Sequence, residues 1–196
     1  MAADGATDEV AVSPDGQSVY VTNILNGSVS QYDVDADGRL SPKSPATVAA
    51  GVIPRVVAVS PDGQSVYVTN GVSDTVSQYD VDAGGRLSPK SPATVANRTP
   101  TGVAVSPDGK SVYVGTESLN ANLPDAVSQY DVGAGGKLSP KSPAELETGI
   151  QPYDVAVSPA APVPTSKSQC KHGGWKQFGF KSQGRCIAFV HRGPRH

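Results

Sequence analysis

The sequence predicts an all-β fold, and the observations that indicate it are its composition and its internal periodicity. Glycine and proline account for 21 and 17 of the 196 residues, whereas hydrophobic residues make up 37% and aromatic residues 6%. Together the two turn formers make about a fifth of the chain, below the roughly 25–30% that is typical of disordered chains. No apolar run approaches the roughly 18 residues of a membrane-spanning helix, so no membrane span is expected.

A sequence repeat of about 47 residues organises most of the chain. The phrase VAVSPDG occurs at residues 10–16, 57–63 and 103–109, and a shortened VAVSP occurs at 155–159. Within each full copy the phrases SVYV, VSQYDV and LSPKSPA follow in the same order. Such self-similarity predicts a row of structurally equivalent units.

Each copy predicts four short antiparallel strands. The first, VAV, is small and apolar throughout, which is typical of a strand buried on both faces. SPDG then predicts a tight turn, because proline fixes φ and glycine accepts a positive φ. SVYVTN and VSQYDV alternate with the period of two that strands show. The dipeptides Asn26-Gly27 and Asn70-Gly71 favour hairpins between these two segments.

The last segment of each copy, LSPKSPATV or its equivalent, carries two prolines with a lysine between them. Proline cannot donate to a ladder, so this strand is expected at an edge, where the lysine would protect an exposed rim. A buried first strand and a blunted last strand are typical of a β-propeller blade. The sequence therefore predicts an all-β partial (open) β-propeller: about three four-stranded antiparallel blades plus one extra inner strand, then a small disulfide-linked C-terminal segment. A solenoid of stacked β-coils is the alternative.

Charge predicts where this repeat region ends. All the acidic residues lie at or before Asp154, whereas seven lysines and arginines follow it. We therefore expect blades over residues 1–158, with repeats at about 10–56, 57–102 and 103–154 and a partial copy at 155–158. A proline- and serine-rich linker is expected at 159–169 and a basic, cysteine-containing module at 170–196.

The repeated phrases resemble those of YVTN-type propellers and of the lactonase family of seven-bladed propellers related to 6-phosphogluconolactonase. The resemblance rests on SPDGQSVYVTN at residues 13–23 and 60–70 and on VSQYDVDADGRLSP at 29–42, and it covers about residues 8–159. It implies a ligand site at one mouth of a central channel, formed by Arg, Glu and His side chains. The C-terminal segment is similar to a short cysteine module of secreted bacterial proteins.

Two features depart from this family. Three blades are too few for a closed ring, which typically has about 4–8 blades. We therefore expect either self-association that completes the ring or a piece of a longer array whose beginning carried a signal peptide. In addition, no histidine precedes His172, so the blades lack an imidazole base.

The candidate site follows from propeller connectivity, which brings the loops after the second and fourth strands to one face. The residues expected there as ligand-binding groups are Asn23, Asn70, Arg55, Arg98, Tyr153 and Asp154. Catalytic candidates are Glu117, as the group that moves a proton, and Arg55 or Arg98, which would bind an anionic sugar acid or a lactone oxygen. The main interpretation is nevertheless a non-catalytic binding or cell-surface scaffold; the alternative is a lactonase-type hydrolase of sugar lactones.

No cofactor or metal is predicted for the blades. Residues 33–38, DVDADG, resemble the start of a calcium loop, but Ser44 stands where that loop needs a glutamate. An Asp-Gly hairpin accounts for the pattern.

In the tail, a Cys170–Cys186 disulfide is predicted, because so short a segment needs a crosslink to fold. Zinc bound by Cys170, His172, Cys186 and His191 and unpaired thiols are the alternatives. A disulfide implies an oxidising compartment, so we expect a secreted or cell-surface protein. The basic charge beside Trp175, Phe178 and Phe180 favours an anionic cell-surface polymer as partner, not nucleic acid.

Overall fold

A computed structural model describes residues 6–118, 123–149, 152–158, 166–172, 176, 182, 183, 186 and 187. The chain divides into two compact units, Met1–Ser158 and Pro159–His196. The linker and module boundaries proposed for the second unit stay predictions.

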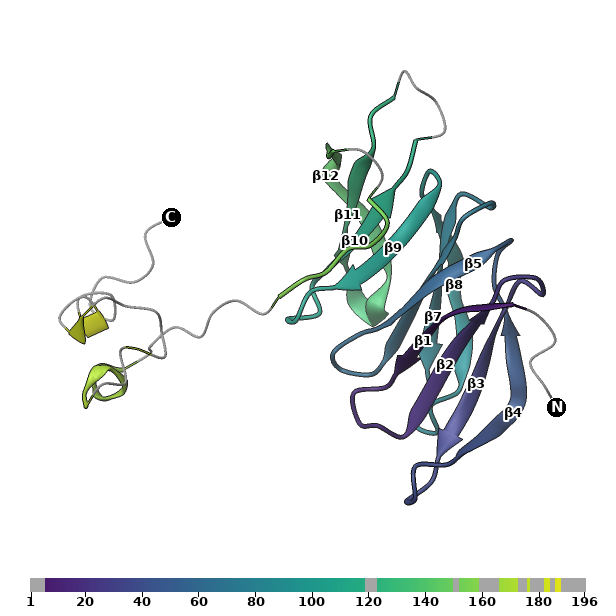
Figure 1. Cartoon of the computed structure of the whole chain (residues 1–196), viewed down its shortest axis with the longest axis horizontal. Coiled ribbons are helices and arrows are strands. Elements are labelled where there is room, and N and C mark those ends of the chain that lie inside the picture. Colours follow the sequence, from purple (N-terminus) through teal and green to yellow (C-terminus); the bar gives the residue numbers. More distant parts are fainter. Residues whose placement is uncertain are drawn as a thin grey trace. The chain divides into compact units, whose positions relative to one another are not determined.

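Within the described part of the first unit, three four-stranded antiparallel sheets follow one another along the chain (Figure 1). Each sheet is a blade whose strands pair in sequence order. Blade 1 comprises β1 (Thr7–Val12), β2 (Ser18–Asn23), β3 (Ser28–Val34) and β4 (Leu40–Ala49). Blade 2 comprises β5 (Pro54–Val59), β6 (Ser65–Asn70), β7 (Thr75–Val81) and β8 (Leu87–Ala96). Blade 3 comprises β9 (Pro100–Val105), β10 (Ser111–Thr116), β11 (Ala126–Val132) and β12 (Leu138–Glu147), with a short 3₁₀ turn, Ala134–Gly136, before β12.

The turn between the first two strands of each blade is built by its own SPDG residues. In blade 2 the Ser60 hydroxyl accepts a hydrogen bond from the Ser65 N–H at 2.9 Å, and the Asp62 carboxylate accepts one from the Gln64 N–H at 3.0 Å. Gly63 takes a φ of 72°, a left-handed conformation that glycine adopts without steric cost. The Ser60 hydroxyl in turn donates to the Asp62 carboxylate. This bond and the one from the Gln64 N–H stabilise the ionised carboxylate, so they lower the pKa of Asp62, the Ser60 hydroxyl contributing most.

The hydrophobic core lies between blades, and the same positions form it twice. Between blades 1 and 2 the buried residues are Tyr20, Val29, Val57, Val66, Val68, Tyr79 and Leu87. Between blades 2 and 3 they are Tyr67, Val76, Val103, Val112, Val114, Tyr130 and Leu138. Blades 1 and 2 thus each present tyrosine and valine, on what we call the trailing face, to the next blade. Blades 2 and 3 receive the previous blade on a leading face that includes valine, tyrosine and leucine.

Polar side chains of one blade also bind the backbone of the next. The Lys43 ammonium donates to the Gly84 carbonyl at 2.7 Å and the Tyr20 hydroxyl donates to the Gly85 carbonyl at 2.8 Å. In blade 2, Lys90 and Tyr67 repeat these bonds to the turn of blade 3, at 2.6 and 2.7 Å. A Cβ at Gly85 would lie 2.0 Å from the Ser18 Oγ, so the close approach of the two blades needs glycine there.

The role expected for these lysines was therefore wrong. Only 1% of the Lys43 side chain is exposed, and its ammonium also pairs with the Asp33 carboxylate. The prolines do stand in the outermost strands, β4, β8 and β12. The lysine between them, however, lies on the side of the strand that packs against the neighbouring blade, so it joins blades instead of protecting a solvated edge.

Two further bonds repeat at both interfaces. The Leu87 N–H donates to the Gln31 side-chain oxygen at 2.9 Å, and the Tyr79 hydroxyl donates to the Ala49 carbonyl at 2.7 Å. Burial raises the pKa of Tyr79 to about 12, so this hydroxyl stays protonated and able to donate at physiological pH. The interface between blades is thus both apolar and hydrogen-bonded.

Residues 152–158 take the position of a fourth inner strand. The Thr101 hydroxyl donates to the Pro152 carbonyl, and a Cβ at Gly102 would lie 2.7 Å from the Asp154 Cα. Within the described residues no second strand pairs with this segment. The predicted fold class is confirmed: the protein is all-β, and its propeller is open.

In the second unit, Cys170 and Cys186 form the predicted disulfide, and both residues are fully buried. A short 3₁₀ helix, Lys167–Cys170, leads into it. Because the two sulfurs bind each other, the alternatives of zinc thiolates and of unpaired thiols are wrong. His191, Trp175, Phe178 and Phe180 lie outside the described residues. None of the helices in the described part of the chain has the length and apolar character to cross a bilayer.

We predict that Tyr67→Phe lowers the free energy of unfolding by about 1 kcal/mol, because it removes a buried hydrogen bond between blades. Tyr113→Phe is the matched control: Tyr113 holds the same position in blade 3, and its hydroxyl has no hydrogen-bond partner within the described residues. Urea unfolding of dilute protein measures both. Equal losses in the two variants would contradict the role given to the Tyr67 hydroxyl.

We also predict a pH-dependent cost for Asp62→Asn. A carboxylate with a lowered pKa stabilises the fold above the ordinary aspartate pKa of about 3.9, and this contribution disappears as the pH falls through the lower folded-state value. The wild type should therefore be more stable than the variant at neutral pH, and the difference should shrink in acid. Urea titrations at a series of pH values measure it; a difference that does not change with pH would count against this assignment.

Candidate functional site

The predicted site lies at the end of the blades where β2 joins β3 and where one blade connects to the next. At this end the Gly71 N–H donates to the Ile53 carbonyl at 2.9 Å, so the two kinds of connection lie side by side. The expected grouping of these connections on one face is therefore correct, but the candidate side chains do not all point to one place.

Asn23 and Asn70 serve the fold. Asn70 is fully buried; its side-chain oxygen accepts from the Gly51 N–H at 3.0 Å and its nitrogen donates to the Ser77 hydroxyl at 2.9 Å. Asn23 donates to the Ser30 hydroxyl at 2.9 Å. Its Oδ1 is buried without a hydrogen-bond partner within the described residues. Neither amide is exposed to a ligand in solution.

Arg98 is directed toward the outer strand of its neighbouring blade. Its guanidinium donates to the Pro124 carbonyl at 3.2 Å and lies 3.5 Å from the Glu145 carboxylate of β12. It lines a groove of about 220 Å³ with Asn97 and Tyr130. The positive charge of Arg98 is thus already paired with a carboxylate.

Arg55 is the candidate that stands at the inner strands. It is the second residue of β5, and its side chain is exposed. A Cβ on Gly71 would lie 2.7 Å from the Arg55 Nε, so the side chain lies over the β6–β7 turn. No carboxylate within the described residues forms an ion pair with it. Its charge is therefore available to an anion or to a carbonyl oxygen.

The other three candidates lie in or directly after the third blade. Glu117 is half-buried just after β10, where its N–H donates to the Thr99 carbonyl at 3.1 Å. Tyr153 is 70% exposed, and Asp154 is exposed beside Gly102, with its carboxylate accepting from the Val155 N–H at 2.7 Å. Tyr153 follows Pro152 as Arg55 follows Pro54, so the repeat places the two at equivalent positions.

Sequence reasoning missed Asp8 and Glu9. Both are exposed residues of β1, at the positions that Arg55 and Val56 hold in β5. The repeat alignment contained the signal, because TDEVAV and PRVVAV occupy the same place in successive copies. The beginnings of the inner segments thus carry one guanidinium, Arg55, and the carboxylates of Asp8, Glu9 and Asp154.

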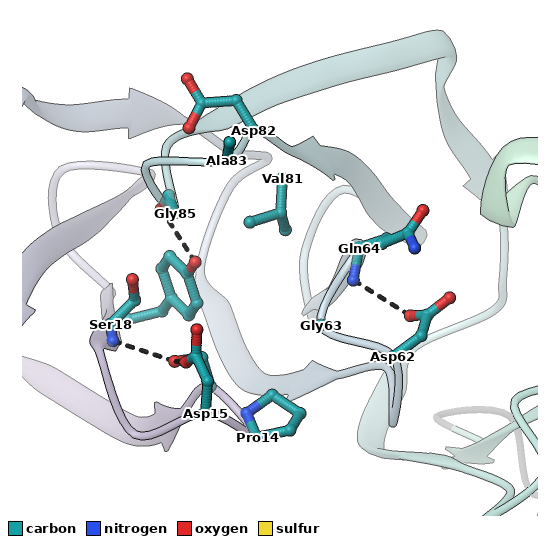
Figure 2. A pocket seen from close by; sticks show the side chains of 12 residues that line it. Pro14, Asp15, Ser18, Asp62, Gly63, Gln64, Val81, Asp82, Ala83 and Gly85 are labelled. Carbon is teal, nitrogen blue, oxygen red and sulfur yellow. Dashed lines mark hydrogen bonds between the residues drawn. The ribbon is translucent and has the colours of Figure 1, made fainter.

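The opposite end of the blades holds a cavity of about 450 Å³ between blades 1 and 2 (Figure 2). The carboxylates of Asp15, Asp62 and Asp82 line it. The Ser13 hydroxyl lowers the pKa of Asp15 most, and the N–H of Arg86 that of Asp82. Each carboxylate therefore binds its own turn. Within the described residues no cluster of three ligating side chains has the arrangement of a metal site.

The calcium-like residues also form a hairpin. The Asp35 carboxylate accepts from the N–H groups of Asp37 and Arg39 at 2.9 and 2.8 Å, and Asp37 pairs with the Arg39 guanidinium at 2.9 Å. These bonds account for the DVDADG pattern through local turn chemistry.

Of the two ends, the Arg55 end has the chemistry for an uncharged or anionic substrate. A guanidinium can bind a carboxylate or phosphate with two hydrogen bonds, and it can stabilise negative charge that develops on a carbonyl oxygen. A carboxylate can accept a proton from water. The acidic cavity has no cation of this kind among its lining residues.

Comparison with known proteins identifies the family to which these blades are similar. Residues 9–162 match the family described as lactonase, 7-bladed beta-propeller. Among solved structures, a putative 6-phosphogluconolactonase of Bacteroides fragilis has a TM-score of 0.65 and 25% identity, over 78% of this chain and 45% of that one. No curated protein matches the chain.

Two other solved structures share the fold. The periplasmic gluconolactonase of Pseudomonas aeruginosa has a TM-score of 0.57 and 23% identity, over 68% of this chain and 39% of that one. The hydrazine synthase of Kuenenia stuttgartiensis has a TM-score of 0.57 and 27% identity, over 74% of this chain and 37% of that one. The chain thus spans less than half the length of each of these three proteins. Their descriptions name different activities, so similarity of the fold alone does not identify an activity.

The family match covers most of the chain and agrees with the sheet topology and with the repeated blade residues. The chain belongs to the lactonase family of seven-bladed β-propellers.

Proposed function

We propose that this chain acts on sugar lactones, with Arg55 as the residue that binds the lactone. The observation that carries the proposal is an exposed guanidinium, without an ion-pair partner in the described part of the chain, at the beginning of an inner strand. Membership of the lactonase family and the similarity to a putative 6-phosphogluconolactonase support lactones as the substrate class.

The proposed reaction is hydrolysis of the ring ester. Water attacks the carbonyl carbon, the bond from that carbon to the ring oxygen breaks, and the ring oxygen takes up a proton. The product is a hydroxy acid, which ionises to a carboxylate. Arg55 donates hydrogen bonds to the carbonyl oxygen as negative charge develops there. A carboxylate of the same end removes a proton from the attacking water.

Four carboxylates are candidates for that base. Glu117 is the one predicted from the sequence, and the repeat positions add Asp8, Glu9 and Asp154 to it. Replacing the acting base by its amide should lower kcat much more than it changes KM, because the amide keeps the shape of the side chain but accepts no proton. The substitutions to compare are Asp8→Asn, Glu9→Gln, Glu117→Gln and Asp154→Asn.

A non-catalytic scaffold is the second candidate, and a specific observation favours it. Three polar residues expected to bind a ligand, Asn23, Asn70 and Arg98, bind other parts of the protein instead. The candidate site therefore keeps few of the polar groups expected in it, and this suits a binding surface better than it suits catalysis. Turnover of a lactone separates the two proposals.

For the C-terminal tail we propose the same partner and location that the sequence predicts. Lys167, Lys171 and Lys176 are exposed, which is compatible with an anionic cell-surface polymer as partner. A disulfide is most common in proteins outside the reducing cytosol, and this supports secretion or display at the cell surface.

We predict that purified protein accelerates acid release from a sugar lactone such as a gluconolactone or its 6-phosphate. Arg55→Ala should lower kcat/KM roughly 100-fold, the usual cost of a lost donor to a developing oxyanion. Arg86→Ala is the matched control, because Arg86 is an exposed arginine on the β7–β8 turn, at the other end of the blade. A pH-stat against the spontaneous rate measures all three proteins.

The result has two informative failures. Acid release no faster than in buffer would favour the scaffold. Turnover that Arg55→Ala leaves unchanged, with native circular dichroism, would retain a lactonase but remove Arg55 from its site.

A further inference from the structure

The two outermost faces of the three blades carry the same residues as the faces that are buried inside the molecule. The trailing face of a blade is defined here by four positions, a serine, a tyrosine, a glutamine and a lysine, and in blade 1 these are Ser18, Tyr20, Gln31 and Lys43. The leading face is defined by an inner valine, a tyrosine, a leucine and a turn glycine. In blade 2 these are Val57, Tyr79, Leu87 and Gly85.

The trailing face of blade 3 is complete but partly exposed. Its four residues are Ser111, Tyr113, Gln129 and Lys141. Tyr20, Tyr67, Gln31 and Gln78 are fully buried at the internal interfaces, whereas Tyr113 and Gln129 are half-buried. The Lys141 side chain is 23% exposed against 1% for Lys43 and Lys90. Its ammonium has its own Asp131 but no turn carbonyl of a following blade within the described residues.

The leading face of blade 1 shows the same contrast. Val10 is 56% exposed and Leu40 is 53% exposed. Their counterparts Val57 and Leu87 are each 5% exposed, because blade 1 covers them. The remaining two positions are Tyr32, which is half-buried, and Gly38, which has a φ of 77° like the turn glycines of the other blades.

We propose that two copies of this chain associate head to tail, with the trailing face of blade 3 of one copy on the leading face of blade 1 of the other. By equivalence with the internal interfaces, Lys141 donates to the Asp37 carbonyl and Tyr113 to the Gly38 carbonyl of the second copy. The Leu40 N–H of that copy donates to the Gln129 side-chain oxygen. Val10 and Leu40 are buried in the same step.

The residues that the close approach requires are present. Inside the chain, a Cβ at Gly85 or Gly136 would lie 2.0 Å from a serine Oγ, so glycine is needed opposite Ser18 and Ser65. Gly38 and Ser111 hold these positions in the proposed contact. Asp37 replaces Gly84, where the three atoms nearest to an added Cβ belong to Arg86 and Asp82 of the same turn and not to the neighbouring blade. A Cβ at this position is therefore compatible with the contact.

One internal bond has no counterpart. The Thr22 hydroxyl donates to the Arg55 carbonyl at 2.7 Å, but Gly115 stands at the equivalent position of blade 3. Beside it, residues 152–158 occupy the place of a following inner strand. Docking of a second copy's β1 therefore displaces this segment. Two copies joined at both contacts bring together six blades, within the range of about 4–8 for closed propellers.

Light scattering over a concentration series tests the proposal, and the expected result is a rise from the mass of one chain to that of two. Gly38→Asn should weaken association roughly tenfold or more, since asparagine tolerates a positive φ but adds a Cβ opposite Ser111. Its control is Gly135→Asn, at a φ of 67° and with no atom within 4 Å of the added Cβ. Lys141→Glu should weaken association similarly; its control is Lys137→Glu, an exposed lysine of the same blade.

A mixing experiment identifies the geometry. Gly38→Asn blocks one face and Lys141→Glu blocks the other, so neither variant should pair with itself, whereas a mixture should form a 1:1 pair through the two intact faces. A mass of one chain at every concentration would overturn the proposal. So would association that the two variants do not weaken, or variants that fail to complement each other although each has native circular dichroism.

Discussion

The contact between successive blades is the constraint on which the rest of this structure depends. Each blade is only one sheet thick, so its apolar residues can be buried only against a neighbour. The contact is also polar: a lysine and a tyrosine of one blade bind two adjacent carbonyls in a glycine turn of the next. A buried ammonium is tolerated only where such acceptors satisfy it. The positions of the lysine, the tyrosine and the glycine are therefore coupled within every repeat.

This coupling limits what the polar residues can do for a ligand. Much of the polar inventory of the repeat, including its buried asparagines, glutamines and threonines, holds strands or blades together. The groups left for chemistry lie at the beginnings of the inner strands, where neighbouring copies differ: Asp8 in β1, Arg55 in β5 and Thr101 in β9 share one position. Within the described residues the side chains of Asp8 and Arg55 form no bond between blades, so variation there can change a site without cost to the blade.

The comparison with the family and the exposed outer faces both indicate that these blades pack against further blades. The three solved structures compared with this chain are each more than twice its matched length, and blades of this type bury their faces against further blades. The trailing face of blade 3 and the leading face of blade 1 are chemically complementary because both derive from one repeat. An interface between copies would then use the same physical interactions as the interior.

The sequence by itself determined the blades. The signals for the strands are local: the repeat, the period-two alternation, the SPDG turns and the prolines. Local backbone preferences, together with the gradient from a buried first strand to a proline-rich last strand, are enough to predict four strands, their order and the outer position of the last one. The disulfide also followed from the short length of the tail. Only the tertiary structure decided where the polar side chains point. Lys43 lies 41 residues from the carbonyl it binds, and Arg98 and Asn70 have partners in other elements. The face on which such a side chain lies depends on how one sheet packs against the next, a relation between distant residues that no local pattern encodes.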